Sequence, residues 1–328
     1  MRPIEWVNPV GERQVVEQLA EGRGATVVKA GGIDLLDRMR LGISAPARLV
    51  NIAALPSLRA ILADDKGLRL GAAATLAQLG AEPLLRPRYT AIAQAAATTA
   101  NPQVRNVATV AGNLLQRPRC WYFRSPDFTC LKKGGQSCPA AEGQNRYHAI
   151  LGGGPSHIVH PSTMATALVC CGARLRIVSA ERAAPREVAL DDFFTLPADD
   201  YQRENRLGPA ELVTEVLVPA APATSRSVYR AVKERQAYDW PLAEAAAAVS
   251  VAGGVVESAR LVLGAAAPIP WRAREAEQLI VGKRLTAALA AEAAQAALAG
   301  ARPLAHNGYK VKLFLPLIER VLLQAAAR

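Results

Sequence analysis

Apolar positions in the first fifty residues alternate between a helical period and short buried runs. Between residues 11 and 20 the apolar side chains recur at the period of an amphipathic helix. The run at 25–30 is short and ends in two glycines, which indicates a buried strand. The pattern predicts, in order, a helix at 11–20, a strand at 25–30, a helix at 34–39 and a strand at 48–52.

Between residues 58 and 218 the pattern changes to hairpin and helix signals. Two alternating runs, 58–62 and 68–71, flank an Asp-Lys-Gly turn and predict a hairpin. Asn101-Pro102 breaks a helical stretch, and we interpret 108–115 as an extended run interrupted by a glycine. Ser162 is placed to cap a helix at 162–171. The remaining predictions are helices at 75–80 and 89–97 and strands at 173–179 and 211–218.

The Pro- and Ala-rich loop at 219–224 is the strongest candidate for a domain boundary. Strands followed by terminal helices predict an α+β domain after it. Pro316 lies in the last expected helix, where it is expected to kink the helix or move its start. The elements expected in this part are strands at 227–233, 243–251 and 254–263 and helices at 286–299 and from about 310.

The composition is that of a globular chain of two or three domains: 328 residues, of which 51% are hydrophobic and 20% charged. The formal charge is +11, but no run of Lys and Arg reaches five residues and aromatics make up only 5%, so nucleic-acid binding is not expected. The N-terminus lacks the apolar core of a secretory signal. The longest uncharged stretch, 147–173, contains Gly152-Gly153-Gly154-Pro155 and is not a membrane span.

Two segments carry groups suited to a phosphate-bearing cofactor. The stretch 30–36 (Ala-Gly-Gly-Ile-Asp-Leu-Leu) follows a strand and opens a helix, so its glycines would let backbone N–H groups approach a phosphate. The stretch 98–114 holds three Thr, three Asn and one Arg, which supply hydroxyl, amide and guanidinium donors. A plain strand–helix turn and a polar loop that satisfies its own backbone are the respective alternatives.

The five cysteines favour a metal site over disulfides. The number is odd, three lie within 19 residues, and the chain shows no export signal. The spacing Cys120-x9-Cys130-x7-Cys138 contains no C-x2-C pair, which disfavours a zinc finger, but three thiolates could still share one cluster. Three unrelated reduced cysteines are the alternative. The neighbouring cations that would favour thiolates are Arg117, Arg119, Arg124, Lys132 and Lys133. Cys170-Cys171 is expected to pack in a core helix.

Nearly the whole chain resembles the FAD-binding medium subunit of the xanthine dehydrogenase/aldehyde oxidase family of molybdenum hydroxylases. The matching stretches are 30–36, 101–113, 160–165 (His-Pro-Ser-Thr-Met-Ala), 211–219, 233–239 and 307–313. The resemblance implies an α+β chain: a PCMH-type FAD-binding domain of two α/β subdomains, 1–56 and 57–220, and a CO-dehydrogenase-flavoprotein-like α+β domain, 221–328. It implies no catalytic residue on this chain.

The resemblance also implies which residues contact FAD. Gly31 and Gly32 would admit the pyrophosphate, Thr109 and Gly112 would lie on the phosphate–ribityl side, and Lys233 would lie at the flavin edge. The family usually has Asp where Thr163 stands. The full implied set is Lys29, Ala30, Gly31, Gly32, Ile33, Asp34, Leu35, Leu36, Thr98, Asn101, Arg105, Ala108, Thr109, Gly112, Asn113, His160, Thr163 and Lys233.

The insertion at 116–157 is similar to that of subunits that carry an additional [4Fe–4S] cluster. Such subunits occur in periplasmic-type aldehyde oxidoreductases, and a related insertion occurs in 4-hydroxybenzoyl-CoA reductases; Arg-Cys-Trp-Tyr-Phe-Arg at 119–124 favours the former. The implied cluster ligands are Cys120, Cys130 and Cys138. Ser156 stands where the resemblance leads us to expect a fourth cysteine.

The implied function is electron transfer within a complex. Electrons would pass from a large molybdopterin-binding subunit through [2Fe–2S] clusters of a small subunit to FAD, and then to an external acceptor. The complex would be cytoplasmic, or periplasmic by co-export with a partner that bears a twin-arginine signal. Two alternatives stay open: a stand-alone FAD-dependent oxidase related to vanillyl-alcohol oxidase, and a cofactor-insertion or scaffold protein.

Overall fold

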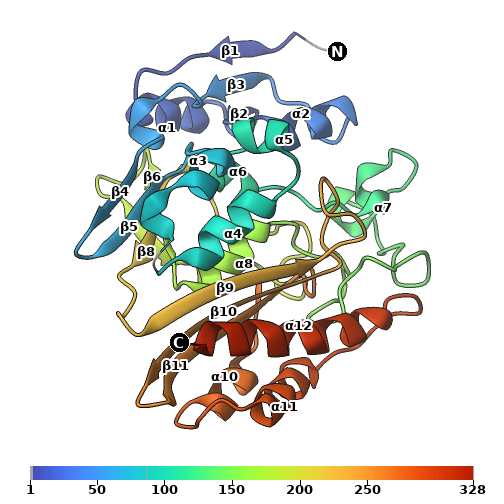
Figure 1. Cartoon of the computed structure of the whole chain (residues 1–328). Coiled ribbons are helices and arrows are strands. Elements are labelled where there is room, and N and C mark those ends of the chain that lie inside the picture. The colour runs from blue at the N-terminus through green and yellow to red at the C-terminus, as the bar shows by residue number, and fades with distance from the viewer. Residues whose placement is uncertain (1–2, 87, 328) are drawn as a thin grey trace.

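The computed structural model describes residues 3–86 and 88–327, which form three β-sheets arranged in sequence order (Figure 1). The first sheet is parallel, with strand order β1-β3-β2. Val15, Val16 and Leu19 of its first helix pack with Val50 of the central strand, as the helical period predicted. The elements of this unit are β1 (Glu5–Val7), α1 (Glu12–Glu21), β2 (Thr26–Lys29), α2 (Ile33–Arg40) and β3 (Arg48–Asn51).

The second sheet is antiparallel and joins segments that are far apart in the sequence. Its strand order is β4-β5-β8-β6-β7. The predicted hairpin is confirmed, and Asp64 Oδ1 accepts hydrogen bonds from the N–H groups of Lys66 and Gly67 in its turn. The strands are β4 (Ile61–Asp64), β5 (Gly67–Gly71), β6 (Arg174–Ser179), β7 (Arg186–Ala189) and β8 (Glu211–Pro219).

Several helices fill the space beside the second sheet and form the largest apolar core with it. Ser162 caps α8 as predicted, since its Oγ accepts a hydrogen bond from the N–H of Ala165 at 2.9 Å. The helices of this region are α3 (Leu76–Ala81), α4 (Thr90–Thr98), α5 (Pro102–Val107), α6 (Val110–Leu114), α8 (Thr163–Cys170) and α9 (Leu190–Phe193), with 3-10 helices η1 (Pro56–Leu58) and η2 (Pro83–Leu85).

The prediction of an extended run at 108–115 is wrong, because these residues include the helix α6. Thr109 caps it, with its Oγ1 accepting a hydrogen bond from the N–H of Gly112 at 3.2 Å. Asn101-Pro102 likewise starts the helix α5 as well as ending the stretch before it. Asn101 is the N-cap and Pro102 the first residue, where its missing N–H costs nothing.

The third sheet is antiparallel, with order β12-β11-β10-β9, and supports the predicted α+β architecture of the C-terminal part. Helix α12 lies along its strands, with α10 and α11 beside it (Figure 1). Pro316 lies inside α12, which begins at Tyr309 and continues through the proline. The elements are β9 (Ser225–Val232), β10 (Ala243–Ala252), β11 (Val255–Gly264), β12 (Trp271–Arg272), α10 (Arg274–Ile280), α11 (Ala287–Leu298) and α12 (Tyr309–Ala326).

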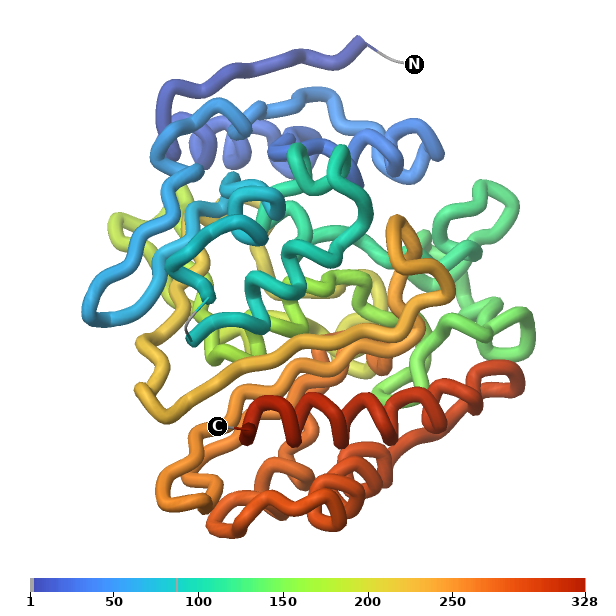
Figure 2. The backbone as a smooth tube through the Cα atoms, viewed as in Figure 1, coloured from blue at the N-terminus to red at the C-terminus, as the bar shows by residue number. Residues whose placement is uncertain are grey.

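The insertion at 116–157 is mostly irregular and protrudes beside the start of α12 (Figure 2). Its only regular elements in the described chain are α7 (Trp121–Arg124) and the 3-10 helix η3 (Leu131–Lys133). Over the described ranges, no helix combines the length and the apolar character that crossing a membrane requires. The subdomain bounds at 56/57 and 220/221 stay predictions.

Candidate functional site

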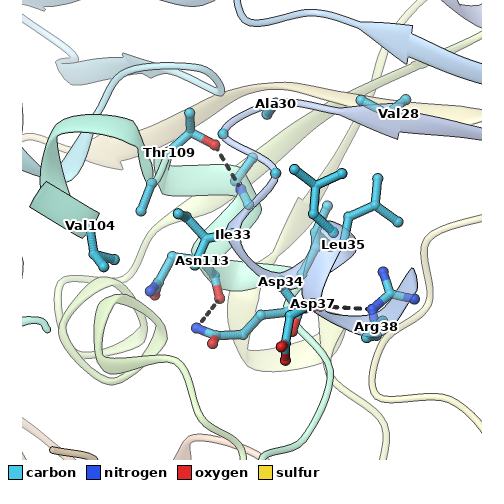
Figure 3. A pocket seen from close by; sticks show the side chains of 18 of the residues that line it. Val28, Ala30, Ile33, Asp34, Leu35, Asp37, Arg38, Val104, Thr109 and Asn113 are labelled. Atoms are coloured by element: carbon cyan, nitrogen blue, oxygen red, sulfur yellow. Dashed lines mark hydrogen bonds and ion pairs between the residues drawn. The ribbon is translucent and has the colours of Figure 1, made fainter. Parts of the chain in front are cut away.

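A cavity of about 570 Å³ lies where the first sheet meets the helices of the second unit. The turn that carries Ile33 and Asp34 faces the helix that carries Thr109 and Asn113 (Figure 3). The structure therefore brings together two segments that the sequence singled out separately. The predicted residues that line this cavity are Ala30, Gly31, Gly32, Ile33, Asp34, Leu35, Leu36, Ala108, Thr109, Gly112 and Asn113.

Gly31 and Gly32 of the first loop are each required to be glycine, but for different structural reasons. Gly32 is the N-cap of α2 and has a φ of 81°, a left-handed conformation that favours glycine. A Cβ on Gly31 would overlap the carbonyl oxygen of Val107 at the end of α5. Gly31 therefore lets the two cavity-lining segments touch, and Gly32 turns the backbone so that the N-terminus of α2 opens toward the cavity.

Several other predicted residues do not line this cavity and instead bind backbone or side-chain groups nearby. Arg105 Nη1 donates to the carbonyl of Thr99 at 2.8 Å, and Lys233 Nζ donates to the carbonyl of Thr98 at 2.6 Å. Lys29 Nζ donates to Asn51 Oδ1 at 3.4 Å. Asn101 caps α5 through a 2.9 Å hydrogen bond from Val104 N. Lys233 and Arg105 thus hold the backbone at 98–99, next to the cavity-lining residues Thr99 and Ala100.

Asp34 is the centre of a buried cluster of charges. Its Oδ1 accepts from Arg124 Nη2 at 2.6 Å and pairs with Arg119 at 3.1 Å, and its Oδ2 accepts from Arg38 Nε at 2.9 Å. Burial opposes ionisation, but these guanidinium groups hold the pKa of Asp34 below its usual value. Asp34 is thus an ionised anchor between the loop and the insertion.

Sequence reasoning missed several residues of the cavity wall. Arg38 and Arg40 bring positive charge from α2, and Tyr238 and Trp240 bring aromatic rings from the loop after β9. The guanidinium of Arg119 lies 4.8 Å from the centre of the Trp240 ring. The signal for the aromatic pair was available, because it overlaps or follows the 233–239 stretch that the family resemblance had picked out.

A second cavity, of about 330 Å³, adjoins the first one. Arg119 and Trp240 line both cavities and therefore stand between them. His160 and Glu244 line the second cavity and are both almost fully buried. Burial lowers the pKa of His160 to about 3, so its imidazole is neutral at pH 7. Thr163, the remaining predicted residue of this region, donates its hydroxyl hydrogen to Glu244 Oε1 at 2.7 Å.

The three cysteines of the insertion lie close enough to influence one another. The pKa of the Cys120 thiol is raised to about 11, mainly by burial and further by the thiols of Cys138 and Cys130. His148 Nε2 lies 3.2 Å from Cys120 Sγ. Ser156 is buried, and the loop that carries it pairs with the segment after His148 through a 2.9 Å hydrogen bond from Ala149 N to His157 O.

Polar contacts tie the insertion to distant parts of the chain. Lys132 Nζ forms a buried ion pair with Glu204 Oε1 at 2.7 Å, and Arg117 pairs with Glu204 Oε2 at 2.6 Å. Asn307 lies just before α12, and its Nδ2 donates hydrogen bonds to the carbonyls of His148 and Ala149 at 3.1 Å each. The insertion is therefore held against both halves of the molecule.

Comparisons with known proteins agree with this architecture. A family model described as the FAD binding domain in molybdopterin dehydrogenase matches residues 2–221, and one described as the CO dehydrogenase flavoprotein C-terminal domain matches residues 227–325. The aldehyde oxidoreductase FAD-binding subunit PaoB of Escherichia coli is 36% identical over 91% of both chains. The carbon monoxide dehydrogenase medium chain of Hydrogenophaga pseudoflava is 25% identical over 99% of this chain and 98% of that protein.

The fold matches as well. A solved structure of carbon monoxide dehydrogenase from Hydrogenophaga pseudoflava superposes with a TM-score of 0.76, covering 99% of this chain and 97% of that chain at 25% identity. The predicted fold class, an FAD-binding part followed by a CO-dehydrogenase-flavoprotein-like α+β part, is confirmed. The chain therefore belongs to the family of FAD-binding medium subunits of molybdenum-containing oxidoreductases that includes the carbon monoxide and xanthine dehydrogenases.

Proposed function

We propose that this chain is the electron-transferring FAD subunit of an aldehyde-oxidoreductase-like complex. Its partners would be a large molybdopterin-binding subunit and a small [2Fe–2S] subunit, and its flavin would pass electrons to an external acceptor. The similarity to an aldehyde oxidoreductase subunit over nine-tenths of both chains supports the substrate class. The observation that carries the proposal is the cavity built jointly by the loop at Gly31-Gly32 and the segment 108–113.

The residues of the cavity fit FAD. The N–H groups at the start of α2, together with Arg38 and Arg40, suit the pyrophosphate. Trp240 offers an aromatic face for the ring system at the far end, and the second cavity continues beyond it. When bound, FAD would supply the redox chemistry of this chain, because a flavin can exchange electrons either one at a time or in pairs. The chain itself positions the cofactor and excludes water from it.

We also propose that the insertion holds a [4Fe–4S] cluster on Cys120, Cys130 and Cys138. The sulfur atoms of Cys130 and Cys138 lie close enough to Cys120 to act on it electrostatically. The Nε2–H of a neutral His148 can donate a hydrogen bond to a Cys120 thiolate. In the described chain no three His, Cys, Asp or Glu side chains converge on one ion, but the thiolates of a cubane bind different irons and stand farther apart. Ser156 supplies an oxygen where a fourth thiolate is expected.

The purified complex tests both proposals through its visible spectrum, its iron content and its EPR signal. We expect flavin bands with a broad iron–sulfur shoulder in the wild-type complex. Cys130→Ala should lose the cluster iron, whereas Ser156→Cys should keep or raise it and shift the potential of the cluster. Cys171→Ala is the matched control, because Cys171 follows α8, outside the insertion, and its loss should leave the iron content unchanged.

Three outcomes would contradict these proposals. Equal iron in Cys130→Ala and the wild type would refute the cluster. A spectrum without flavin would refute the assignment of the cofactor. Turnover of an aldehyde by this chain alone, without partner subunits, would favour the stand-alone oxidase instead.

A further inference from the structure

Glu244 of β10 is a buried carboxylate held by hydroxyl groups. Only 3% of the surface of Glu244 is exposed to solvent. Oε1 accepts a hydrogen bond from Thr163 Oγ1 at 2.7 Å, and Oε2 accepts one from Thr166 Oγ1 at 2.9 Å. No ion pair among the described residues includes Glu244, and Lys233 acts on this carboxylate only from a longer distance.

The fold makes room for this group. A Cβ on Gly264 of the neighbouring strand would overlap both Glu244 Oε2 and Thr166 Oγ1. Burial raises the pKa of Glu244, while the hydroxyls of Thr163 and Thr166, the charge of Lys233 and the hydroxyl of Tyr229 act in the opposite direction. A buried carboxyl with no cation in direct contact is costly for stability, and its presence here points to a function.

Glu244 and His160 line the same cavity of about 330 Å³. His160 Nδ1 accepts a hydrogen bond from Ser162 N at 3.3 Å, which leaves the proton of the neutral ring on Nε2. That Nε2 is buried and has no partner among the described residues. Among the residues that line the cavity, His160 therefore supplies a buried donor without a protein partner, and Glu244 supplies a buried acceptor. A ligand that contacts both needs an acceptor and a donor of its own.

The cavity lies between the larger cavity and the insertion, since it is lined by Arg119 and Trp240 on one side and by Cys120 and His148 on the other. The cavity shares Arg119 and Trp240 with the larger one, so a molecule that extends past these two side chains reaches His160 and Glu244. The isoalloxazine and ribityl part of FAD carries carbonyl oxygens, an N–H and hydroxyls, which match both groups. Thr163, where the family motif has Asp, donates to Glu244 instead of facing the ligand with a carboxylate of its own.

We propose that Glu244, held in place by Thr163, Thr166 and Gly264, is the carboxylate with which this chain binds the flavin end of its FAD. The role that an Asp at position 163 would have is thereby moved from the start of α8 to β10. This inference rests on the proposed function, because it requires that the chain binds FAD.

The test measures FAD affinity and flavin potential in the purified complex. We expect Glu244→Gln to weaken FAD binding about tenfold, as loss of a charged hydrogen bond does, and to raise the flavin midpoint potential because a negative charge is removed. Thr163→Asp in the Glu244→Gln background should restore most of the affinity. In the wild-type background the same Thr163→Asp should weaken binding, since two carboxylates would then meet. This reversal of sign would not arise from a purely structural role.

Two further variants keep the inference testable if Glu244→Gln folds poorly. Thr166→Val removes one hydroxyl donor at constant shape and should weaken FAD binding severalfold. Gly264→Ala should displace the carboxylate and reproduce the loss seen in Glu244→Gln. Glu257→Gln is the matched control: Glu257 is exposed on β11 of the same sheet and lines neither cavity, so FAD affinity should change less than twofold.

Other outcomes would overturn the inference. Wild-type FAD affinity and potential in Glu244→Gln would exclude contact with the flavin. Unchanged FAD affinity together with a raised KM for the external acceptor would assign the cavity to the acceptor. A wild-type complex that contains no FAD would instead refute the proposed function itself.

Discussion

The carboxylate of Asp34 and the guanidinium of Arg124 are joined by a 2.6 Å hydrogen-bonded ion pair across 90 residues of sequence. Asp34 lies on the loop that lines the large cavity, and Arg124 ends the short helix that follows Cys120. Both side chains are nearly nine-tenths buried. The pair therefore couples the candidate FAD site to the candidate cluster site mechanically.

Replacement of Asp34 should loosen both sites together. Asp34→Asn leaves Arg38, Arg119 and Arg124 without their shared anion, and we expect a loss of about 3 kcal/mol in the free energy of unfolding. FAD and iron content should both fall. Asp37→Asn is the control: Asp37 also pairs with Arg124 but is 47% exposed, so its loss should cost under about 1 kcal/mol. Equal melting curves for Asp34→Asn and Asp37→Asn would contradict this role.

Gly31 should tolerate no side chain. In Gly31→Ala the new Cβ meets the backbone of Val107, so the two loops must separate, at a cost of roughly 1–3 kcal/mol. We expect the FAD content of the purified complex to fall while the fold survives. Gly11→Ala is a matched control, because a Cβ there has open space and the backbone is extended, with a φ of −170°. A full complement of FAD in Gly31→Ala would show that the loops need not touch.

Lys310 should make the stability of the chain depend on pH above neutrality. Its Nζ donates to the carbonyls of His148 and Ala265, and burial lowers its pKa to about 7, with Glu244 acting against this shift. The unfolded chain holds this proton up to about pH 10.4, so between pH 7 and 10 it binds more protons than the folded chain. The contribution of Lys310 to the free energy of unfolding therefore rises with pH in that window, by about 1 kcal/mol per pH unit.

A comparison with Lys310→Met isolates this effect. Chemical unfolding at pH 6, 7, 8 and 9 should show that the wild type gains stability relative to the variant from pH 7 upward. Between pH 5 and 6.5 the difference between the two should stay constant, because Lys310 is protonated in both states there. Parallel curves over the whole range would mean that Lys310 does not titrate in this window.

The sequence by itself determined the secondary structure wherever local rules apply. The periodic apolar residues of α1, the turn at Asp64 and the cap at Ser162 all occur as predicted, because each depends on neighbours within a few positions. The extended run expected at 108–115 was wrong for a related reason. The cap hydrogen bond from Gly112 to Thr109 decides that segment, and a glycine inside it obscured the helical period.

The candidate site could be assembled only in part from the sequence. Both cofactor-facing loops were found, since glycines and side-chain donors mark them locally. The partners of single side chains could not be predicted in this way. Asp34 lines the large cavity and also holds three guanidinium groups, while Lys233 and Arg105 donate to backbone carbonyls. That these three residues contact the cofactor stays a prediction.

The tertiary structure alone decided which distant groups meet. Thr163 and Glu244 are 81 residues apart, His148 and Cys120 are 28 apart, and Lys132 reaches Glu204 from an irregular loop. The periodic pattern of apolar residues contains no signal for these pairs. They form only when the third sheet packs on α8 and the insertion packs against both halves of the chain. A buried charge must find its partner wherever the chain topology puts one, so the chemistry of the site depends on the packing of elements that are remote in sequence.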